Sequence, residues 1–241
     1  MLPSMTMPGY QTKLERVAIA GVNDLVIRSL LDRQQFHDPT GAAERLGICS
    51  ASWPLFGLLW PSGIQLAAQL ALRPVCANER ILEIGCGLAL GSLVAHRRGA
   101  RITASDCHPL AQAFLDKNVL LNGMSPLKYR HGQWGSAALA PIDGVVLSAR
   151  YDLIVGSDLL YERDMPEALA RFIDGHALPD AEVWMVDPNR GHRTAFNRRM
   201  AVYGFELASD KRLGQLAQSG ADGADDYKGR LLVYRRRGFA D

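Results

Sequence analysis

Short apolar runs alternate with longer amphipathic stretches along residues 80–203. The apolar runs predict five strands: Arg80–Ile84, Arg101–Ser105, Leu127–His131, Tyr151–Ser157 and Ala181–Val186. The longer stretches predict four helices: Leu90–Arg98, Pro109–Asn122, Met165–His176 and Thr194–Tyr203. Strands that alternate with helices in this way favour βαβ units and a mainly parallel sheet.

The end of the chain departs from this alternation. Phe205–Ser209 and Arg230–Arg235 are strand-like runs without a clear helix between them, and we expect them to pair antiparallel through the Gly/Asp-rich loop at 219–226. The complete pattern predicts an α/β fold: a Rossmann-like, doubly wound sheet of seven strands, mostly parallel with an antiparallel last strand. Ligands in such folds bind at the carboxyl ends of the strands, near the point where the strand order reverses.

The first 50 residues carry a different pattern. Leu14–Ala20 and Leu25–Leu30 are β-like runs on either side of Asn23-Asp24, a pair of residues typical of turns. A β-hairpin is therefore predicted. The change of pattern divides the chain into an N-terminal extension, 1–50, and an α/β domain, 51–241.

An apolar segment leads into the first helix of this domain. Ser62–Leu72 has a helical pattern, and Ser62 is a suitable N-cap because its hydroxyl can accept a hydrogen bond from a backbone N–H of the first turn. Trp53 and Phe56, just ahead, are candidates for ordinary core around this helix.

Composition narrows the class of partner. The chain has 241 residues, of which 48% are hydrophobic and 22% charged, with a net charge of +2. These values are typical of a globular protein and not of a dedicated nucleic-acid binder, so no nucleic-acid partner is expected. The densest basic run, Arg235–Arg237, is expected to be a solvated chain end, with contact to a phosphate or a partner as the alternative.

Cysteine and histidine usage argues against a metal site. None of the four cysteines forms a C-x-x-C pair, and the six histidines include no H-E-x-x-H motif. Reduced thiols and an N-terminus unlike a secretory leader favour the cytoplasm. No run of 18 apolar residues is present, so no membrane-spanning segment is expected. The sequence leaves the oligomeric state open.

The strongest chemical signal is a glycine-rich turn, ILEIGCGLALG, at residues 81–91. Gly85, Gly87 and Gly91 follow a predicted strand and precede a predicted helix, where glycine permits a tight turn and close approach of a ligand. Their G-x-G-x-x-x-G spacing misses the dinucleotide fingerprint by one residue. Such turns also occur for packing reasons alone.

Two carboxylates sharpen the choice of ligand. Glu83, two residues before the first glycine, would repel a phosphate and attract a cation. S-adenosylmethionine carries a sulfonium and an ammonium and no phosphate. Asp106 ends the next predicted strand, 21 residues after Gly85, where an acidic side chain binds ribose hydroxyls. The alternatives are a salt bridge from Glu83 to a nearby arginine and a helix N-cap role for Asp106.

With these residues the chain resembles the class I, seven-β-strand S-adenosylmethionine-dependent methyltransferases, over about residues 50–237. Three further motifs are similar to the protein-lysine methyltransferase group that includes the methyltransferase-like 21 enzymes and calmodulin-lysine methyltransferase. They are Leu59-Trp60-Pro61, Gln133-Trp134-Gly135 and Asp158-Leu159-Leu160-Tyr161. Bacterial members of this group are often labelled as nicotinamide N-methyltransferases. The predicted N-terminal hairpin also resembles that of the group.

The resemblance implies S-adenosyl-L-methionine as cofactor, with S-adenosyl-L-homocysteine as product. The matching residues expected to bind it are Trp60, Glu83, Gly85, Cys86, Gly87, Asp106, Cys107, Trp134 and Ser157. Among them, Asp106 would hold the ribose and Trp134 would flank the adenine. Trp60 would close over the cofactor, and Ser157 would border its methionine end.

Asp158 and Tyr161 follow the strand expected to end beside the transferred methyl group. They lie three residues apart, so both side chains can face one pocket. A lysine amine, with a pKa of about 10.4, must lose its proton before it attacks. A carboxylate and a phenol could orient the amine and accept that proton, so these two are predicted as the catalytic residues. The alternative is a capping aspartate and a packing tyrosine.

Four further residues, Asp187-Pro188-Asn189-Arg190, follow the next predicted strand on the same edge of the sheet. They could shape the acceptor pocket or form a simple turn with an arginine salt bridge. The leading interpretation of the whole sequence is methylation of a protein lysine. The alternatives are methylation of a small amine or pyridine, a non-catalytic binding protein with the same fold, and a nicotinamide dehydrogenase.

Overall fold

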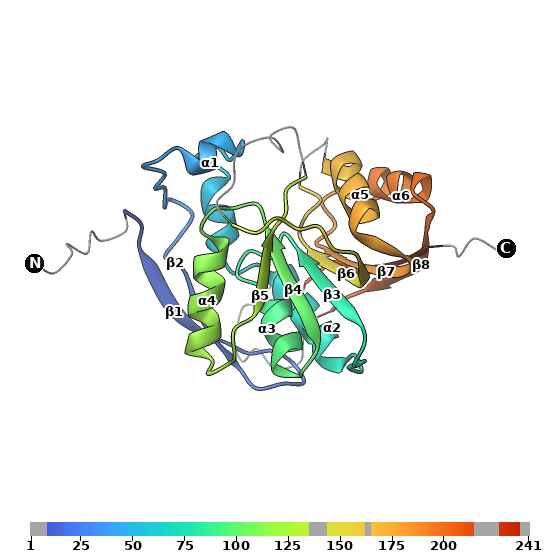
Figure 1. Cartoon of the computed structure of the whole chain (residues 1–241), viewed down its shortest axis with the longest axis horizontal. Helices are drawn as coiled ribbons and strands as arrows, with labels where there is room; N and C mark the ends of the chain where they lie inside the picture. The colour runs from blue at the N-terminus through green and yellow to red at the C-terminus, as the bar shows by residue number, and fades with distance from the viewer. Residues whose placement is uncertain (1–8, 135–143, 162–164, 215–226, 237–241) are drawn as a thin grey trace, which may run out of the picture.

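Seven strands form one mixed sheet at the centre of the molecule, as the computed structural model shows (Figure 1). The structure describes residues 9–134, 144–161, 165–214 and 227–236. The sheet has the order β5-β4-β3-β6-β7-β9-β8. Its strands are β3 (Arg80–Ile84), β4 (Arg101–Asp106), β5 (Lys128–His131), β6 (Tyr151–Ser157), β7 (Ala177–Asp187), β8 (Phe205–Arg212) and β9 (Arg230–Arg236).

The strand pairing confirms the predicted fold class. β5, β4, β3, β6 and β7 pair parallel, and β9 pairs antiparallel with both β7 and β8. The strand order reverses between β3 and β6, so the carboxyl ends of these two strands flank the expected ligand site. The loop predicted at 219–226 lies outside the described residues.

Helices cover both faces of the sheet, which explains why its central strands β3 and β6 are buried at most positions. Leu82 and Ile84 of β3 pack into a cluster with residues of α5 (Met165–His176) and α6 (Arg193–Val202). Ile81, on the opposite face of the same strand, packs with Leu66 and Leu70 of α2 (Pro61–Leu72). Beside α2 lies α3 (Leu90–Arg97), and α4 (Ala111–Leu121) lies next to the N-terminal strands in Figure 1.

The N-terminal hairpin is confirmed, with β1 (Thr12–Val17) paired antiparallel to β2 (Leu25–Leu30). The hairpin packs against α4, where the side chains of two asparagines bond the free backbone edge of β2 as a neighbouring strand would. Asn122 accepts a hydrogen bond from Val26 N (2.9 Å) and donates to Val26 O (2.8 Å). Asn118 accepts from Arg28 N (2.8 Å) and donates to Arg28 O (3.3 Å). The edge of β2 is thereby satisfied. The domain boundary at residue 50 stays a prediction.

Several element bounds differ from those expected. β8 extends three residues further than its apolar run, because its pairing with β9 continues through polar positions at the sheet edge. β7 starts four residues earlier than its apolar run, with Ala177 paired to Tyr151 across a register shift. Two short helices were not expected, α1 (Ala42–Arg45) and the 3₁₀ helix η1 (Trp53–Gly57). Both lie in segments without helical periodicity.

The N-cap prediction for Ser62 is wrong. Helix α2 begins at Pro61, with Trp60 in the capping position and no side-chain cap. Proline is favoured in the first turn because its missing N–H is not needed there. The Ser62 hydroxyl instead hydrogen-bonds the Tyr227 hydroxyl, at 2.8 Å.

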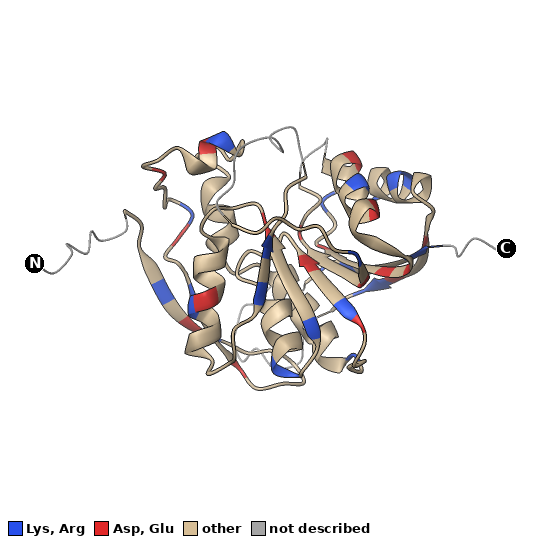
Figure 2. Ribbon diagram, in the orientation of Figure 1, with Lys and Arg blue, Asp and Glu red and all other residues tan. Residues whose placement is uncertain are grey.

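The expectation of a solvated chain end holds for only part of the basic run near the C-terminus: the Arg235 side chain is largely exposed, whereas that of Arg236 is mostly buried. Arg235 pairs with Glu182 (2.8 Å), and Arg236 pairs with Asp174 (2.6 Å) with its guanidinium 4.5 Å from the Phe205 ring centre. Both arginines belong to β9, whereas Arg237 lies outside the described residues. Figure 2 shows acidic and basic residues distributed together over the described helices and strands.

The stretch Trp53–Leu72, 20 residues, is long and apolar enough to cross a membrane by length and composition alone. It is not an unbroken apolar run, so the expectation of no membrane-spanning candidate does not hold for this stretch. Half of the stretch is buried in the protein, and within it α2 packs against α3, β6 and β7. A core helix passes the same test, so the fold already accounts for the apolar character of this segment.

Candidate functional site

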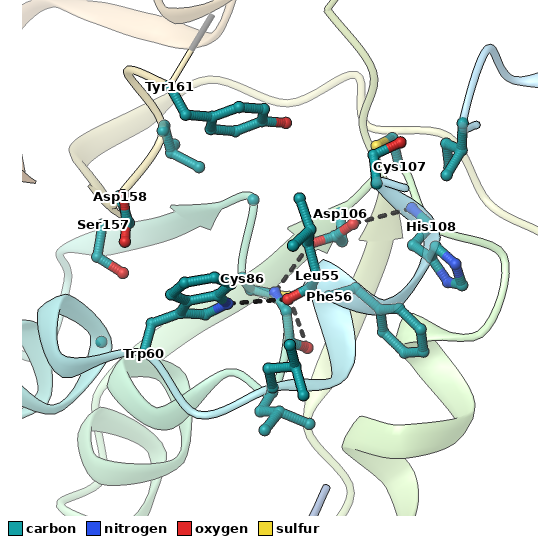
Figure 3. Close-up of a pocket in the computed structure, with 18 of the residues that line it drawn as sticks. Leu55, Phe56, Trp60, Cys86, Asp106, Cys107, His108, Ser157, Asp158 and Tyr161 are labelled. Atoms are coloured by element: carbon teal, nitrogen blue, oxygen red, sulfur yellow. Dashed lines mark hydrogen bonds between the residues drawn. The ribbon is translucent and has the colours of Figure 1, made fainter. Parts of the chain in front are cut away.

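A cavity of about 560 Å³ opens at the carboxyl ends of β3, β4 and β6. All eleven site residues predicted from the sequence line it: Trp60, Glu83, Gly85, Cys86, Gly87, Asp106, Cys107, Trp134, Ser157, Asp158 and Tyr161. In Figure 3, Trp60, Ser157 and Asp158 lie at one end and Cys107 and His108 at the other, with Asp106 between them. The structure therefore brings the predicted residues together, while their individual roles stay predictions.

The glycine turn is confirmed in position and in its need for glycine. Gly87 has a φ of +51°, and a Cβ there would lie 2.8 Å from the carbonyl oxygen of Phe56. A Cβ at Gly91 would lie 2.9 Å from Glu83 Oε1. Any other residue would push the turn away from η1 or displace the glutamate.

Glu83 is held by the first turn of α3. Its side chain is buried, and Oε2 accepts a hydrogen bond from Ser92 N at 2.6 Å. Burial raises the pKa of Glu83 to about 7, while hydrogen bonds from Ser92 and the Gly91 N–H oppose the rise. The alternative of a salt bridge to arginine is wrong, because backbone N–H groups at the positive end of a helix hold the carboxylate.

Asp106 ties the glycine turn to the end of β4. Its Oδ2 accepts from Gly87 N and its Oδ1 from His108 N, both at 2.8 Å. Burial raises the pKa of this carboxyl, and the backbone donors oppose it. The N-cap alternative is wrong, since α4 begins five residues later with Leu110 in the capping position. Each carboxylate oxygen keeps accepting capacity for a ligand hydroxyl.

His108 and Phe56 were missed as site residues by the sequence analysis. Their rings stack with centroids 3.6 Å apart and an interplanar angle of 12°, and both line the cavity. Burial lowers the pKa of His108 to about 3, so the imidazole is neutral. Its Nδ1 accepts from Leu110 N (3.2 Å), while Nε2 is buried and has no hydrogen-bond partner among the residues that the structure describes. The sequence signal was only the position of His108, two residues after Asp106.

The two predicted tryptophans use their indole N–H groups within the protein. Trp60 donates to Leu55 O at 2.9 Å (Figure 3). The Arg33 guanidinium lies 5.1 Å from the centre of the Trp60 ring. Trp134 Nε1 contacts Met165 Sδ at 2.9 Å. These contacts fix the orientation of both rings at the cavity wall.

Asp158 and Arg190 form an ion pair at the Ser157 end of the cavity. Asp158 has a left-handed backbone, with φ +57°, and its N–H donates to Val186 O at 2.9 Å. Its two carboxylate oxygens accept from Arg190 Nε (2.7 Å) and Nη2 (3.0 Å). The hydrogen bond to Asp158 is the largest cause of a raised Arg190 pKa. The arginine salt bridge expected for the 187–190 segment is confirmed. Arg190 also lines the cavity, and a role of the segment in an acceptor pocket stays a prediction.

Tyr161 lines the same cavity, and in Figure 3 its hydroxyl points toward the side on which Cys107 lies. Nearby, Asp187 is buried at the end of β7, where Oδ2 accepts from Asn189 N (2.9 Å) and Oδ1 has no hydrogen-bond partner in the described part of the chain. Burial raises the pKa of Asp187. Among the residues that the structure describes, no group of three or more His, Cys, Asp or Glu side chains could hold a metal ion.

Comparison with known proteins gives matches at the level of family and fold. The lysine methyltransferase family model matches residues 56–197, more than half of the chain. The chain is 26% identical over 163 residues to the electron transfer flavoprotein beta subunit lysine methyltransferase of Mus musculus, across 66% of this chain and 60% of that protein. It is 25% identical over 169 residues to protein N-lysine methyltransferase METTL21A of Xenopus tropicalis, across 65% and 74%.

A further relative is named as a methyltransferase of arginine and not of lysine. The chain is 29% identical over 132 residues to histone-arginine methyltransferase METTL23 of Xenopus laevis, across 52% of this chain and 54% of that protein. The chain spans about half to three fifths of the length of the flavoprotein-directed relatives that it matches.

Solved structures share the fold. The ribosomal protein L11 methylase of Lactobacillus delbrueckii subsp. bulgaricus has a TM-score of 0.52 at 19% identity, across 74% of this chain and 81% of that one. SMU.776 complexed with SAH has a TM-score of 0.55 at 12% identity, across 97% and 58%. The region matched by the family model contains the glycine turn, Asp106 and the Asp158–Arg190 pair, and by this match the chain belongs to the lysine methyltransferase family.

Proposed function

We propose that the protein is an S-adenosylmethionine-dependent methyltransferase that methylates the side-chain amine of a protein lysine. One observation carries the proposal: a single cavity joins a buried carboxylate beside the glycine turn to a second carboxylate and a phenol at the next strand end. The first end suits a cationic cofactor and the second suits a basic acceptor. The family to which the chain belongs supports the same activity.

The residues present fit the cofactor. Glu83 is a buried carboxylate that pairs with no side-chain cation of the described ranges, so a bound ammonium would supply the charge that its site lacks. Asp106 faces the same cavity with free accepting capacity for ribose hydroxyls, and Trp134 offers an aromatic wall to the adenine. When bound, S-adenosylmethionine supplies a methyl group already activated by its sulfonium.

The chain's own contribution to the transfer is mainly positioning. An amine must reach the methyl group in line with the breaking bond and without its proton. Asp158 holds the incoming nitrogen by charge and accepts its proton, and the Tyr161 phenol orients it. The left-handed backbone of Asp158 aims this carboxylate into the cavity instead of along the strand.

The choice of acceptor rests on the relatives. The named lysine methyltransferases among them act on proteins, and METTL23 is named for histone arginine. A small amine or pyridine is the alternative acceptor, and a non-catalytic binding protein is the alternative of another class. A cytoplasmic location is part of the proposal and rests on four cysteines that are all free.

Calorimetric titration of the purified chain with S-adenosylhomocysteine and, separately, NAD tests the cofactor half. Micromolar binding of the first alone is expected. A labelled-methyl screen of lysate proteins and small amines then tests the acceptor, with the product identified as methyl-lysine by mass spectrometry. Label only on a small amine would reassign the acceptor, and binding of neither S-adenosylhomocysteine nor NAD would favour a non-catalytic protein.

A further inference from the structure

The Asp158–Arg190 pair sits where the proposed function needs an acceptor nitrogen. Both side chains line the cavity beside Ser157 and Tyr161. Arg190 meets Asp158 with two parallel hydrogen bonds, the strongest geometry available to an arginine and a carboxylate. In this arrangement the Asp158 carboxylate is engaged by a cation of the chain itself.

We propose that Arg190 occupies the acceptor's cation site, and that a cationic acceptor enters by displacing it from Asp158. The inference rests on the proposed function and names the residue that selects the acceptor. Arg190 acts as a gate and does not take part in the transfer.

The two partners differ in how firmly the chain holds them. Asp158 follows directly from β6, its N–H is bonded to Val186 O, and only 11% of its side chain is exposed. The Arg190 side chain is 43% exposed, and both of its hydrogen bonds within the described part of the chain go to Asp158. When the pair opens, Arg190 can therefore move into solvent while Asp158 stays in place.

The backbone around Arg190 suits such a movement. It lies in the loop between β7 and α6, flanked by Asn189 at φ +70° and Gly191 at φ +93°. Neither a helix nor the sheet holds this residue. The loop can relax without breaking a strand pair.

The gate favours one class of acceptor. When an ammonium group of the acceptor replaces the Arg190 guanidinium, one positive charge takes the place of another, so the Asp158 carboxylate remains paired with a cation. A neutral side chain of the same size would leave Asp158 beside an apolar group after losing its partner, which is unfavourable at a largely buried site. The proposal thus assigns selection for a protonated side chain, such as that of lysine, to the Asp158–Arg190 pair.

The probe for this gate is n-butylammonium, which has the length of a lysine side chain, with 1-butanol as its neutral match. Dissociation constants are measured by ligand-observed NMR at fixed ionic strength, with and without saturating S-adenosylhomocysteine. Arg190→Gln is expected to bind n-butylammonium at least about threefold tighter than the wild type, because an internal competitor is gone. Binding of 1-butanol should not change.

Matched variants separate the gate from simple loss of a positive charge. Arg193→Gln removes a nearby arginine that pairs with Asp210 (3.3 Å) outside the cavity, and it should leave the affinity as it is. Arg190→Lys should fall between wild type and Arg190→Gln, because one ammonium replaces a two-point contact. The gain should vanish in the double variant Arg190→Gln/Asp158→Asn.

Equal or weaker binding of n-butylammonium by Arg190→Gln would overturn the gate, as would an equal gain in Arg193→Gln. A direct signature is available in the wild type, where the Arg190 Nε–H NMR signal should shift when n-butylammonium is added. Failure of S-adenosylhomocysteine to bind would count against the proposed function alone, because the pair is tested in the ligand-free chain as well.

Discussion

The two ends of the cavity hold their carboxylates in different ways. Glu83 and Asp106 are buried, and backbone N–H groups of α3, the glycine turn and the turn after β4 satisfy them. Asp158 is satisfied by a side chain, Arg190, which is nearly half exposed. Backbone donors cannot leave, whereas an exposed guanidinium can.

This difference matches the two tasks that the ends are proposed to perform. A cofactor site benefits from fixed side chains, because groups that are already ordered before the ligand arrives lower the entropy cost of binding. An acceptor site must admit and release a side chain in every cycle, and a replaceable partner suits that requirement. Mutations at the two ends should therefore have separable effects on cofactor binding and on turnover.

The largest separation is expected from Asp158→Ala. Turnover on the acceptor found in the methyl screen should fall about 100-fold or more, the usual contribution of a positioned acid–base group. Affinity for S-adenosylhomocysteine should stay within about twofold of wild type, since Asp158 is absent from the backbone network of the cofactor end. Full turnover by this variant would remove Asp158 from the catalytic pair.

Two glycine substitutions test how rigidly the glycine turn of the cofactor end is held. Gly87→Ala should lower the free energy of unfolding by about 2–4 kcal/mol, because left-handed strain adds to the contact with the Phe56 carbonyl. Gly99→Ala is the matched control. Gly99 has φ +85° and open space around a Cβ, so only the strain of about 1–2 kcal/mol should remain. Urea unfolding of both variants gives the difference, and equal losses would mean that the turn tolerates the contact.

Asp106→Ala should weaken S-adenosylhomocysteine binding by about 1–3 kcal/mol, because hydrogen bonds to a charged acceptor are lost. Two backbone donors, Gly87 N and His108 N, are left unpaired in the same variant. Asp106→Asn keeps one carbonyl acceptor and should lose less. Calorimetry distinguishes the two, and unchanged affinity in Asp106→Ala would exclude Asp106 from the cofactor site.

The sequence predicts which residues come together at the site, but it does not predict the contacts that these residues make with one another. Ten of the eleven predicted residues meet in one cavity because they lie in or just after the last residues of neighbouring parallel strands, which end at a common edge. The eleventh, Trp60, reaches the cavity from the start of α2. The stacking of His108 on Phe56 joins residues 52 positions apart, and neither lies in a periodic segment. The Asp158–Arg190 pair likewise depends on a left-handed residue that local propensity disfavours.

The N-terminal hairpin is likewise predicted from the sequence without the contacts that hold it to the rest of the fold. Its two strands were visible as β-like runs, yet nothing local pointed to Asn118 and Asn122 as their docking partners. An asparagine inside a helix is normally a weak choice, since its side chain competes for backbone groups. Here the asparagine side chains bond the backbone edge of β2 instead of the backbone of their own helix. Asn118 and Arg28, which form one of these contacts, are about 90 residues apart in the chain.

The smallest predicted effect concerns the protonation of Glu83. Its pKa of about 7 lies above the ordinary value of 4.5, so the buried carboxyl is largely protonated below pH 7 in the folded chain. By linkage, its contribution to stability is fully present below pH 4.5 and is lost as the pH rises through 7. A cationic ligand reverses the preference, because it stabilises the ionised carboxylate.

Affinity for S-adenosylhomocysteine, which carries an ammonium, should therefore rise about tenfold between pH 6 and pH 8, with proton release on binding. Calorimetry in two buffers of different ionisation enthalpy measures both quantities. Glu83→Gln should bind more weakly and with a flat pH profile over this range, while Asp158→Asn should keep the wild-type slope. A wild-type profile that is flat as well would mean that Glu83 stays ionised in the empty site. The backbone N–H groups of α3 would then outweigh burial, and the cofactor end would be fixed in charge as well as in shape.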